Sequence, residues 1–587
     1  MKKIFLKNPG WTKHIRLLLL SIAVGVISGL GAILFDDLLQ LALKYFINLP
    51  TGYIEPGKGA PTIAIQGFSS PHSWLLIIIP FLGGLVSGLM VYLIAPEAEG
   101  HGTDAMIEAF HQRAGYIRKR VPFVKILASA LTIGSGGSAG KEGPIAQIGA
   151  GFGSFLGSTL KLKPRDRRIL VLAGAAAGIG AIFRAPLGAA LYAPEVLYRE
   201  MELESEAILP CVVASIMAFS IFSLFYRHGA LFFPGPVDFA LPRELLPYAL
   251  FGVVCALAGY LYVRVFYGMR DYFFQILPIP RLFRPALGGL MLGLIIFYYP
   301  QVSSTGYGWV QMAMEGKILW QTMLLLALFK ILATSCTISS GGSGGVFGPS
   351  VFIGAMLGGA FGFLGQKLAP GWVINPNSFV LVGIGGFFAG VAKVPLASII
   401  MACEMCASYN LLVPLMLVSC ISIVLLGRTT LYEKQMISRI VSPAHVAEFA
   451  RGLLSEMYVY QAVNPQPLTL IPEKTPFTEL IKTVTSSPVA YFPTVDEQGK
   501  ITGILSINDI REVLFEESLN KIILAKDVAT PNVVRVFWND TLQEALDKMA
   551  ALKIDELPVV REEAPDEIVA MISKQDIISY YHSRSED

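Results

Sequence analysis

A glycine-rich stretch inside apolar sequence, residues 134–153, constrains the fold of this chain more than any other segment. It reads GSGGSAGKEGPIAQIGAGFG and contains one charged pair, Lys141 and Glu142. Clustered glycines indicate that the backbone comes close to another group or adopts dihedral angles closed to other residues. An acid is costly within a membrane, so Glu142 is a candidate functional residue.

The composition predicts a polytopic membrane protein. Hydrophobic residues make up 53% of the chain, charged residues 15%, and the mean hydropathy is +0.58. The apolar run over residues 17–35 is too long for the apolar core of a signal peptide and predicts a first membrane helix. We expect the protein in the cell membrane, and the basic residues before this run predict that its N-terminus lies in the cytoplasm. The basic loops 113–120 and 161–168 are expected on the same side.

The net charge and the cysteines give no sign of nucleic-acid binding or of a metal site. The net charge of +3 gives no indication of nucleic-acid binding. All six cysteines lie in apolar segments, so we interpret the Cys403-x-x-Cys406 motif as packing, and we expect no metal site.

Several apolar segments are shorter than the roughly 20 residues that a membrane-spanning helix needs. Short segments interrupted by glycine and proline predict re-entrant half-helices, which are tolerated where protein surrounds them. After about residue 440 charges become frequent. We therefore predict an all-α membrane domain over residues 1–440, followed by a soluble cytoplasmic domain over residues 441–587.

The membrane domain contains an internal repeat. Residues 83–88 recur as residues 288–293, and residues 136–144 recur as residues 341–349, both at a separation of 205 residues. The pattern Pro-Leu followed by Glu, which ends at Glu195, recurs with its end at Glu404. These matches define halves at about 73–226 and 286–427. Inverted repeats of this kind place a ligand site near the middle of the membrane, at the interface of the halves.

The predicted half-helices that open at the glycine motifs would point their N-termini at this site. Helix N-termini carry unpaired N–H groups and partial positive charge, so they favour an anion. A divalent-cation channel would need acidic or carbonyl rings along its pathway. A membrane enzyme would need a metal cluster or a nucleophile beside a base. The sequence shows neither pattern, and we expect a transporter or channel that is not an enzyme.

The segments GKEGP at 140–144 and GGVFGP at 344–349, with the paired Pro-Leu…Glu motifs, resemble the CLC family of chloride channels and proton-coupled anion antiporters. The resemblance implies a homodimer in the lipid bilayer, with one pathway per subunit for chloride or a similar small anion. Antiporters of the family also move protons. The alternative is a transporter or channel for another ion, such as nitrate, another halide or a divalent cation, which the soluble domain would likewise regulate.

The resemblance also implies roles for individual residues. Glu142 would be the gating glutamate, whose carboxylate occupies an anion site until it swings away or is protonated. Backbone N–H groups around Val346 and Phe347 would coordinate the central anion, and the hydroxyl of Tyr432 would donate to it. The alternative for Tyr432 is an interfacial tyrosine. The other expected anion-binding positions are His101, Gly102, Gly140, Lys141 and Gly143.

Two positions depart from the family pattern. His101 stands where many members have an anion-coordinating serine; it donates to the anion, more strongly when protonated, or turns away and leaves its backbone N–H to do so. Val196 stands where antiporters commonly have the inner proton-transfer glutamate. Passive conduction and proton-coupled exchange therefore both stay open.

The soluble domain also repeats, since residues 503–510 parallel residues 570–577. The pattern is similar to a pair of α/β CBS domains, at about 463–517 and 524–583. In nucleotide-binding CBS pairs, an aspartate in an S/T-x-x-D motif holds an adenosine ribose, and the residues in question here are Ser506, Asp509, Ser573 and Asp576. The alternative is that these residues only cap helices. We expect no required cofactor, and an adenine nucleotide is the candidate ligand of the pair.

Overall fold

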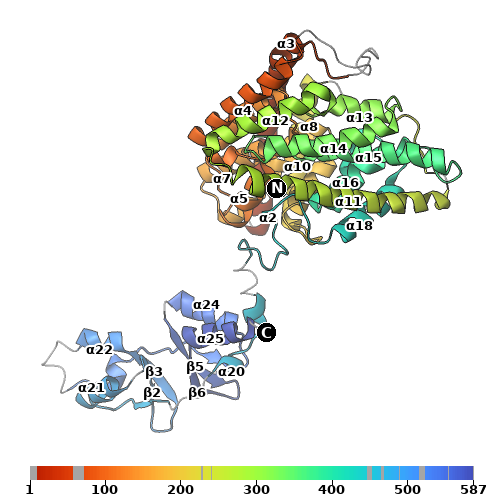
Figure 1. Ribbon diagram of the computed structural model, residues 1–587. Coiled ribbons are helices and arrows are strands. Elements are labelled where there is room, and N and C mark those ends of the chain that lie inside the picture. Colours follow the sequence, from red (N-terminus) through yellow and green to blue (C-terminus); the bar gives the residue numbers. More distant parts are fainter. Residues whose placement is uncertain are drawn as a thin grey trace. The chain divides into compact units, whose positions relative to one another are not determined.

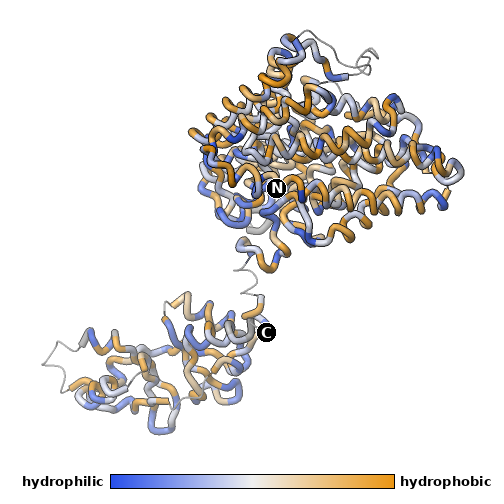
Figure 2. Tube along the Cα trace, viewed as in Figure 1, coloured by the Kyte–Doolittle hydropathy of each residue, from blue (hydrophilic) through white to orange (hydrophobic). Residues whose placement is uncertain are grey.

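The computed structural model describes residues 9–56, 72–226, 229–239, 241–445, 452–463, 468–487, 489–513, 522–552 and 554–585. Parts of the predicted domain ranges, and the first basic residues of the chain, lie outside these residues. The chain forms two compact units, Met1–Ala444 and His445–Asp587. Figure 2 shows that the helices of the first unit are largely hydrophobic along their length.

The first unit is all helical (Figure 1). Its α-helices are α2 (Pro9–Ala42), α3 (Leu49–Thr51), α4 (Leu75–Ile94), α5 (Thr103–His111), α6 (Val121–Gly134), α7 (Glu142–Thr159), α8 (Pro164–Phe183), α9 (Pro186–Glu195), α10 (Ser205–Phe225), α11 (Leu245–Met269), α12 (Arg284–Tyr298), α13 (Tyr307–Met314), α14 (Trp320–Ile338), α15 (Phe347–Leu368), α16 (Ser378–Ala392), α17 (Pro395–Cys406) and α18 (Leu412–Leu426). Short 3₁₀ or π segments are η1 (Leu43–Asn48), η3 (Pro96–Ala98), η4 (Pro242–Glu244), η5 (Arg270–Phe274), η6 (Arg281–Phe283) and η7 (Pro300–Val302).

This unit contains both long and short helices, as the lengths of the apolar segments predicted. Within the described residues, seven helical segments are long and apolar enough to cross a membrane. Helices α5, α9, α13 and α17 have only 9, 10, 8 and 12 residues. Helices α7 and α15, which open at the glycine motifs, have 18 and 22 residues and are longer than the half-helices expected there. Their apolar sequence continues without a break after each motif, so nothing ends them early.

The two halves pair through the backbone of their glycine motifs. Gly140 N–H donates to Gly345 O at 2.8 Å, and Gly345 N–H donates to Gly140 O at 2.6 Å. The turns that lead into these segments have the same shape, since φ is +99° at Gly136 and +100° at Gly341. The repeat seen in the sequence is therefore a physical pairing of two equivalent loops.

The glutamates of the repeated Pro-Leu…Glu motifs cap each other's helices. Glu195, at the end of α9, accepts from the N–H groups of Leu396 and Ala397 at the start of α17 (2.9 and 2.8 Å). Glu404 of α17 accepts in turn from the first N–H groups of α9. This exchange assigns Glu195 a structural role, because each acid satisfies two amides at a helix start that have no partner within their own helix.

Two buried lysines also form an equivalent pair, and in each half the lysine precedes the Pro-Leu…Glu motif in the chain. Lys125 of α6 donates to the carbonyls of Ala98 (3.0 Å) and Gly100 (2.7 Å). Lys330 of α14 donates to the equivalent carbonyls, of Val302 (3.0 Å) and Ser304 (2.8 Å). Both lysines are 0% exposed. Each ammonium group fixes the loop that leads into a short helix, α5 or α13.

The second unit contains two three-stranded sheets, with orders β1-β2-β3 and β4-β5-β6. In each sheet the first pair is parallel and the second antiparallel, for example Phe492 opposite Leu505 and Leu557 opposite Ile572. The elements are α20 (Val459–Ala462), β1 (Ile471–Pro472), α21 (Phe477–Ser486), β2 (Tyr491–Val495), β3 (Ile501–Ser506), α22 (Ile507–Val513), α23 (Ala525–Val528), β4 (Val536–Phe537), α24 (Leu542–Leu552), β5 (Glu556–Arg561), β6 (Ala564–Ser573) and α25 (Lys574–Ser585).

We predict that Lys330→Met destabilises the membrane unit. Methionine has a similar length but lacks the ammonium group. The substitution therefore leaves two buried carbonyls without a donor, at a cost of about 1–3 kcal/mol for each unsatisfied group. Thermal unfolding of the purified protein in detergent should show a lower midpoint for Lys330→Met. The decrease should be smaller for its repeat equivalent Lys125→Met, because Ser343 and Gly344 still donate to the two carbonyls that Lys125 holds. The exposed Lys367→Met is the control, and equal midpoints for Lys330→Met and Lys367→Met would contradict the prediction.

Candidate functional site

Three helix starts meet at the glycine motifs, those of α5, α7 and α15. A Cβ atom at Gly143, in the first turn of α7, would overlap the carbonyl oxygen of His101, just before α5. A Cβ atom at Gly345, just before α15, would lie 2.8 Å from the amide nitrogen of Gly143. Glycine is required here because the three backbones approach one another more closely than side chains allow. Their N-terminal N–H groups are thereby gathered in one place.

Glu142 lies at the centre of this arrangement and is 2% exposed. Its Oε2 accepts from the N–H of Gly348 at 3.1 Å, in the first turn of α15, and its Oε1 accepts from the hydroxyl of Tyr307. A Cβ atom at Gly140 would overlap Oε2, so that glycine makes room for the carboxylate. The side chain thus places negative charge at the N-terminus of the opposite half's helix.

Val346 and Phe347 stand at the start of α15. Their backbone N–H groups are the ones that the sequence predicted to coordinate the anion. Val346 is the N-cap and Phe347 the first helical residue. The ring of Phe347 packs edge-on against Phe183 (ring centroids 4.7 Å apart) and Phe388 (4.2 Å). The ring is therefore part of an apolar cluster, and the predicted anion contact concerns only the backbone of Phe347.

Tyr432 is buried in the same unit, at 1% exposure. The hydroxyl of Tyr192 on α9 donates to the Tyr432 hydroxyl at 3.0 Å, and the hydroxyl of Thr103 also interacts with both phenols. A tyrosine in a lipid–water interface would be exposed, so the burial argues against that alternative. Tyr192 and Thr103 are members of this cluster that the sequence did not single out.

His101 stands next to Tyr432, with ring centroids 5.4 Å apart. Its Nε2 lies 3.2 Å from Asp104 Oδ2, while its Nδ1 is buried and has no hydrogen-bond partner among the described residues. Because Nε2 carries the proton that Asp104 accepts, Nδ1 can donate only when the imidazole takes a second proton. The ring neither turns away to solvent nor donates from Nδ1 in its neutral form.

Two cavities lie at the two ends of this group of residues. A cavity of about 390 Å³ is lined by His101, Gly102 and Asp104, with Arg270 and Lys434 among its charged groups. A second cavity, of about 300 Å³, is lined by Lys141 and Tyr307 with Glu55. The ammonium group of Lys141 forms an ion pair with Asp36 of α2 at 2.7 Å, so its charge is already balanced.

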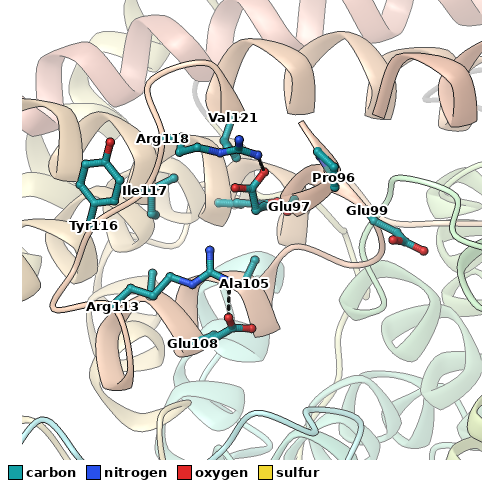
Figure 3. Close-up of a pocket in the computed structure, with 12 residues that line it drawn as sticks. Pro96, Glu97, Glu99, Ala105, Glu108, Arg113, Tyr116, Ile117, Arg118 and Val121 are labelled. Carbon is teal, nitrogen blue, oxygen red and sulfur yellow. Dashed lines mark hydrogen bonds and ion pairs between the residues drawn. The ribbon is translucent and has the colours of Figure 1, made fainter. Parts of the chain in front are cut away.

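A third cavity, of about 220 Å³, lies beside α5 and is shown in Figure 3. Four of its charged groups form two pairs, since Arg118 contacts Glu97 and Arg113 lies 2.5 Å from Glu108, and the remaining charged lining residue, Glu99, is an acid. Paired charges of this kind offer an anion no net attraction, so this cavity is not part of the candidate anion site.

Val196, at the expected inner proton-transfer position, is completely buried. Its carbonyl accepts from the side-chain amide of Gln435 at 3.0 Å, and the same amide group donates to Ala392 O at 2.9 Å. The position holds the segment after α18 in place, and its side chain has no group that carries a proton.

The two serine–aspartate motifs of the second unit form helix caps. Asp509 Oδ2 accepts from the N–H and hydroxyl of Ser506, both at 2.7 Å, and Asp576 Oδ2 does the same with Ser573, at 2.9 and 2.6 Å. The second motif lies in more acidic surroundings. Burial, followed by the charges of Asp576 and Asp555, raises the pKa of the Glu556 carboxyl.

The repeat offset also marks two lysines that the interpretation of the sequence did not single out. Lys125 and Lys330 stand 205 residues apart, as the glycine motifs do, and a lysine in an apolar helix is a rare residue. Tyr307 lies in a weaker repeat, of residues 100–102 at residues 306–308, but its importance comes from a contact with a residue 165 positions away. Among the described residues, no group of three or more His, Cys, Asp or Glu side chains is arranged for a metal ion.

Comparisons with known proteins agree with this geometry. The family model described as voltage gated chloride channel matches residues 83–427, and the CBS domain model matches residues 460–516 and 525–583. The putative chloride channel protein ClcB-like of Ralstonia nicotianae is 31% identical over 403 residues, covering 68% of this chain and 90% of that protein. The H(+)/Cl(-) exchange transporter ClcA of Cronobacter sakazakii is 27% identical over 421 residues, covering 70% and 86%.

A solved structure extends the comparison to the fold. The crystal structure of a slow cyanobacterial Cl-/H+ antiporter matches with a TM-score of 0.62 at 23% identity, covering 75% of this chain and 98% of that one. The fold expected from the sequence, a helical membrane domain followed by α/β CBS domains, is confirmed. Because the family model covers more than half of the chain, this multi-pass membrane protein belongs to the CLC family of chloride channels and exchangers, with a C-terminal pair of CBS domains.

Proposed function

We propose that this protein moves chloride, or a similar small anion, across a membrane along a pathway that Glu142 gates. The observation that carries the proposal is the bond from the Gly348 N–H to the Glu142 carboxylate. A carboxylate at a helix N-terminus occupies the place that the helix offers to a free anion. The carboxylate and the anion compete for the same amide groups.

The gate follows from this competition. Ionised Glu142 blocks the site, and a proton on the carboxyl weakens its hold because a neutral acid is a poorer acceptor for the Gly348 amide. The anion then takes the vacated amides and passes toward Tyr432, whose hydroxyl supplies a donor at the other end of the buried segment. The backbone around Gly140, Gly143, Val346 and Phe347 lines the path between them.

We predict that Glu142→Gln removes the part of the pH dependence of anion flux that arises at the gate. Glutamine has similar size but cannot ionise, so the site no longer switches between a blocked and an open form. Flux of chloride and of protons should be followed together in proteoliposomes, with Glu142→Gln beside the wild type. If the wild type drives protons with a chloride gradient, the variant should lose that coupling; coupling retained in Glu142→Gln would contradict the assignment of the gate.

The same assay separates exchange from conduction. Proton movement driven by a chloride gradient identifies an exchanger, whereas chloride flux without a pH change identifies a channel. Val196 supplies no side-chain proton carrier at the inner position, so an exchanger would need another inner route for protons.

Our second proposal within the pathway concerns His101. Its buried Nδ1 has no partner among the described residues, and its Nε2 is held by Asp104. A doubly protonated His101 directs an N–H toward the anion from beside Tyr432. An imidazolium in place of a serine hydroxyl favours anions other than chloride as well, so nitrate and other halides are the alternative substrates.

We predict that His101→Ser lowers anion affinity at acidic pH by about tenfold, because a hydrogen bond to a charged donor is lost. Calorimetric titration with chloride should be done in a Glu142→Gln background, which removes the carboxylate that competes with the anion. His14→Gln, in the same background, is the control. Equal chloride affinities at acidic pH with and without the His101→Ser substitution would show that His101 does not bind the anion.

The resemblance to the family and the charges of the loops support a proposal for the assembly and the orientation. We propose a homodimer with one pathway in each subunit. The N-terminus and the CBS pair lie on the cytoplasmic side of the cell membrane, together with the basic loops 113–120 and 161–168.

We propose that the CBS pair binds an adenine nucleotide, with the ribose hydroxyls donating to Asp509 or Asp576. Each aspartate uses Oδ2 for its own cap, and the ribose would engage Oδ1. The site around Asp509 suits the phosphates better, because the uncharged Ala490 and Tyr491 stand there at the positions that Asp555 and Glu556 occupy in the second repeat.

We predict that Asp509→Ala weakens binding of ATP to the full-length protein more than Asp576→Ala does. Calorimetry in detergent measures both, and Glu497→Gln, in an exposed ion pair with Lys474, is the control. Absence of ATP binding to the wild type would leave the two motifs as helix caps alone.

A further inference from the structure

The hydroxyl of Tyr307 donates to the carboxylate of Glu142, and the anion pathway described above does not use this tyrosine. Tyr307 is the first residue of α13 and follows Gly306, whose φ of +76° places it as the N-cap. Its ring packs edge-on against Phe232, with centroids 5.5 Å apart. The ring is therefore fixed by packing, while the hydroxyl reaches the gating acid.

The position of Tyr307 in the repeat supports a functional role. Helix α5 begins in the same way as α13, with Gly102 at φ +83° followed by Thr103. Thr103 interacts with Tyr192 and Tyr432 at one end of the pathway, and Tyr307 contacts Glu142 at the other. The two helices thus present a hydroxyl from the same position to opposite ends of the buried segment.

We propose that Tyr307 is a positioning residue that holds ionised Glu142 on the Gly348 amide and thereby sets the pH at which the gate opens. This inference rests on the proposed role of Glu142. A phenol O–H donates strongly to a carboxylate and only weakly to a neutral carboxylic acid. The bond favours the blocked form, and Tyr307 keeps its own proton throughout.

The proton that opens the gate comes from the solvent of the 300 Å³ cavity, which Tyr307 lines together with Lys141. Tyr307 lines this cavity and contacts Glu142, which is not itself a lining residue, so the phenol stands between the cavity and the carboxyl group. Other charged and titratable groups around the pair come from several elements: Asp36 of α2, Tyr53 and Glu55 of the segment after α3, Lys141 before α7, and Lys330 of α14. Since Lys141 pairs with Asp36 and Lys330 is held by two carbonyls, neither of these cations donates to Glu142 itself.

The expected effect has a definite sign. Without the Tyr307 hydroxyl, ionised Glu142 loses a charge-assisted hydrogen bond, so Glu142 takes up a proton at a higher pH. Loss of one such bond corresponds to a shift of about one pH unit in the midpoint of activation. The flux-versus-pH curve of Tyr307→Phe should therefore move toward alkaline pH with its shape unchanged.

The experiment measures chloride flux against external pH in proteoliposomes of full-length protein. The set comprises the wild type, Tyr307→Phe, Glu142→Gln and the double variant. Tyr307→Phe should shift the curve only while Glu142 is present, and the double variant should match Glu142→Gln. Tyr248→Phe is the control, since that buried tyrosine bonds to Ser378 at 2.7 Å, away from the gate.

A second measurement tests the same bond without removing the hydroxyl. Replacement of Tyr307 by 3-fluorotyrosine makes the phenol a stronger donor, so the curve should shift toward acidic pH, opposite to Tyr307→Phe. A purely structural tyrosine would not give shifts of opposite sign. This arm also decides the matter if Tyr307→Phe does not fold.

The outcomes separate this inference from the function on which it rests. If Glu142→Gln abolishes the pH dependence but neither change at 307 moves the wild-type curve, Tyr307 does not position the gate and only this inference fails. If Glu142→Gln keeps the wild-type pH dependence, the gate itself is wrongly assigned, and both proposals fall.

Discussion

The mutual hydrogen bonds of Gly140 and Gly345 are the contact on which the rest of the membrane unit depends. Each loop satisfies the other's backbone groups in a place where neither water nor lipid can do so. The two helices that follow, α7 and α15, consequently start beside each other. Their first amides are left for an acid or an anion, and Glu142 takes one of them.

Polar groups inside this unit fall into two classes according to the repeat. Four of those that support the fold form two equivalent pairs: Lys125 with Lys330, each holding two carbonyls, and Glu195 with Glu404, each capping the other half's helix. A buried polar or charged group is tolerated when hydrogen bonds surround it. Each half meets this requirement with the same set of contacts, one lysine on two carbonyls and one glutamate on two amides.

The candidate gate is where the equivalence is broken. Glu142 stands at the position that Phe347 occupies in the second half, and Thr103 stands where the second half has Tyr307. One half therefore supplies a carboxylate and the other an apolar ring and a phenol donor. A pathway with two different ends needs such asymmetry, because a symmetric site would give both sides of the membrane the same gate.

The sequence by itself determined the membrane class, the two repeated halves, the family and the position of Glu142, because glycine spacing and rare charges in apolar segments are local signals. It also placed the CBS pair. It left His101 with two alternatives, since only the neighbouring Asp104 carboxylate and Tyr432 ring decide which nitrogen carries the proton. Tertiary structure alone decided that Tyr307 meets Glu142 and that Glu195 caps α17. Both contacts join residues from opposite halves, and no local pattern records which side chains the pairing of the halves brings together.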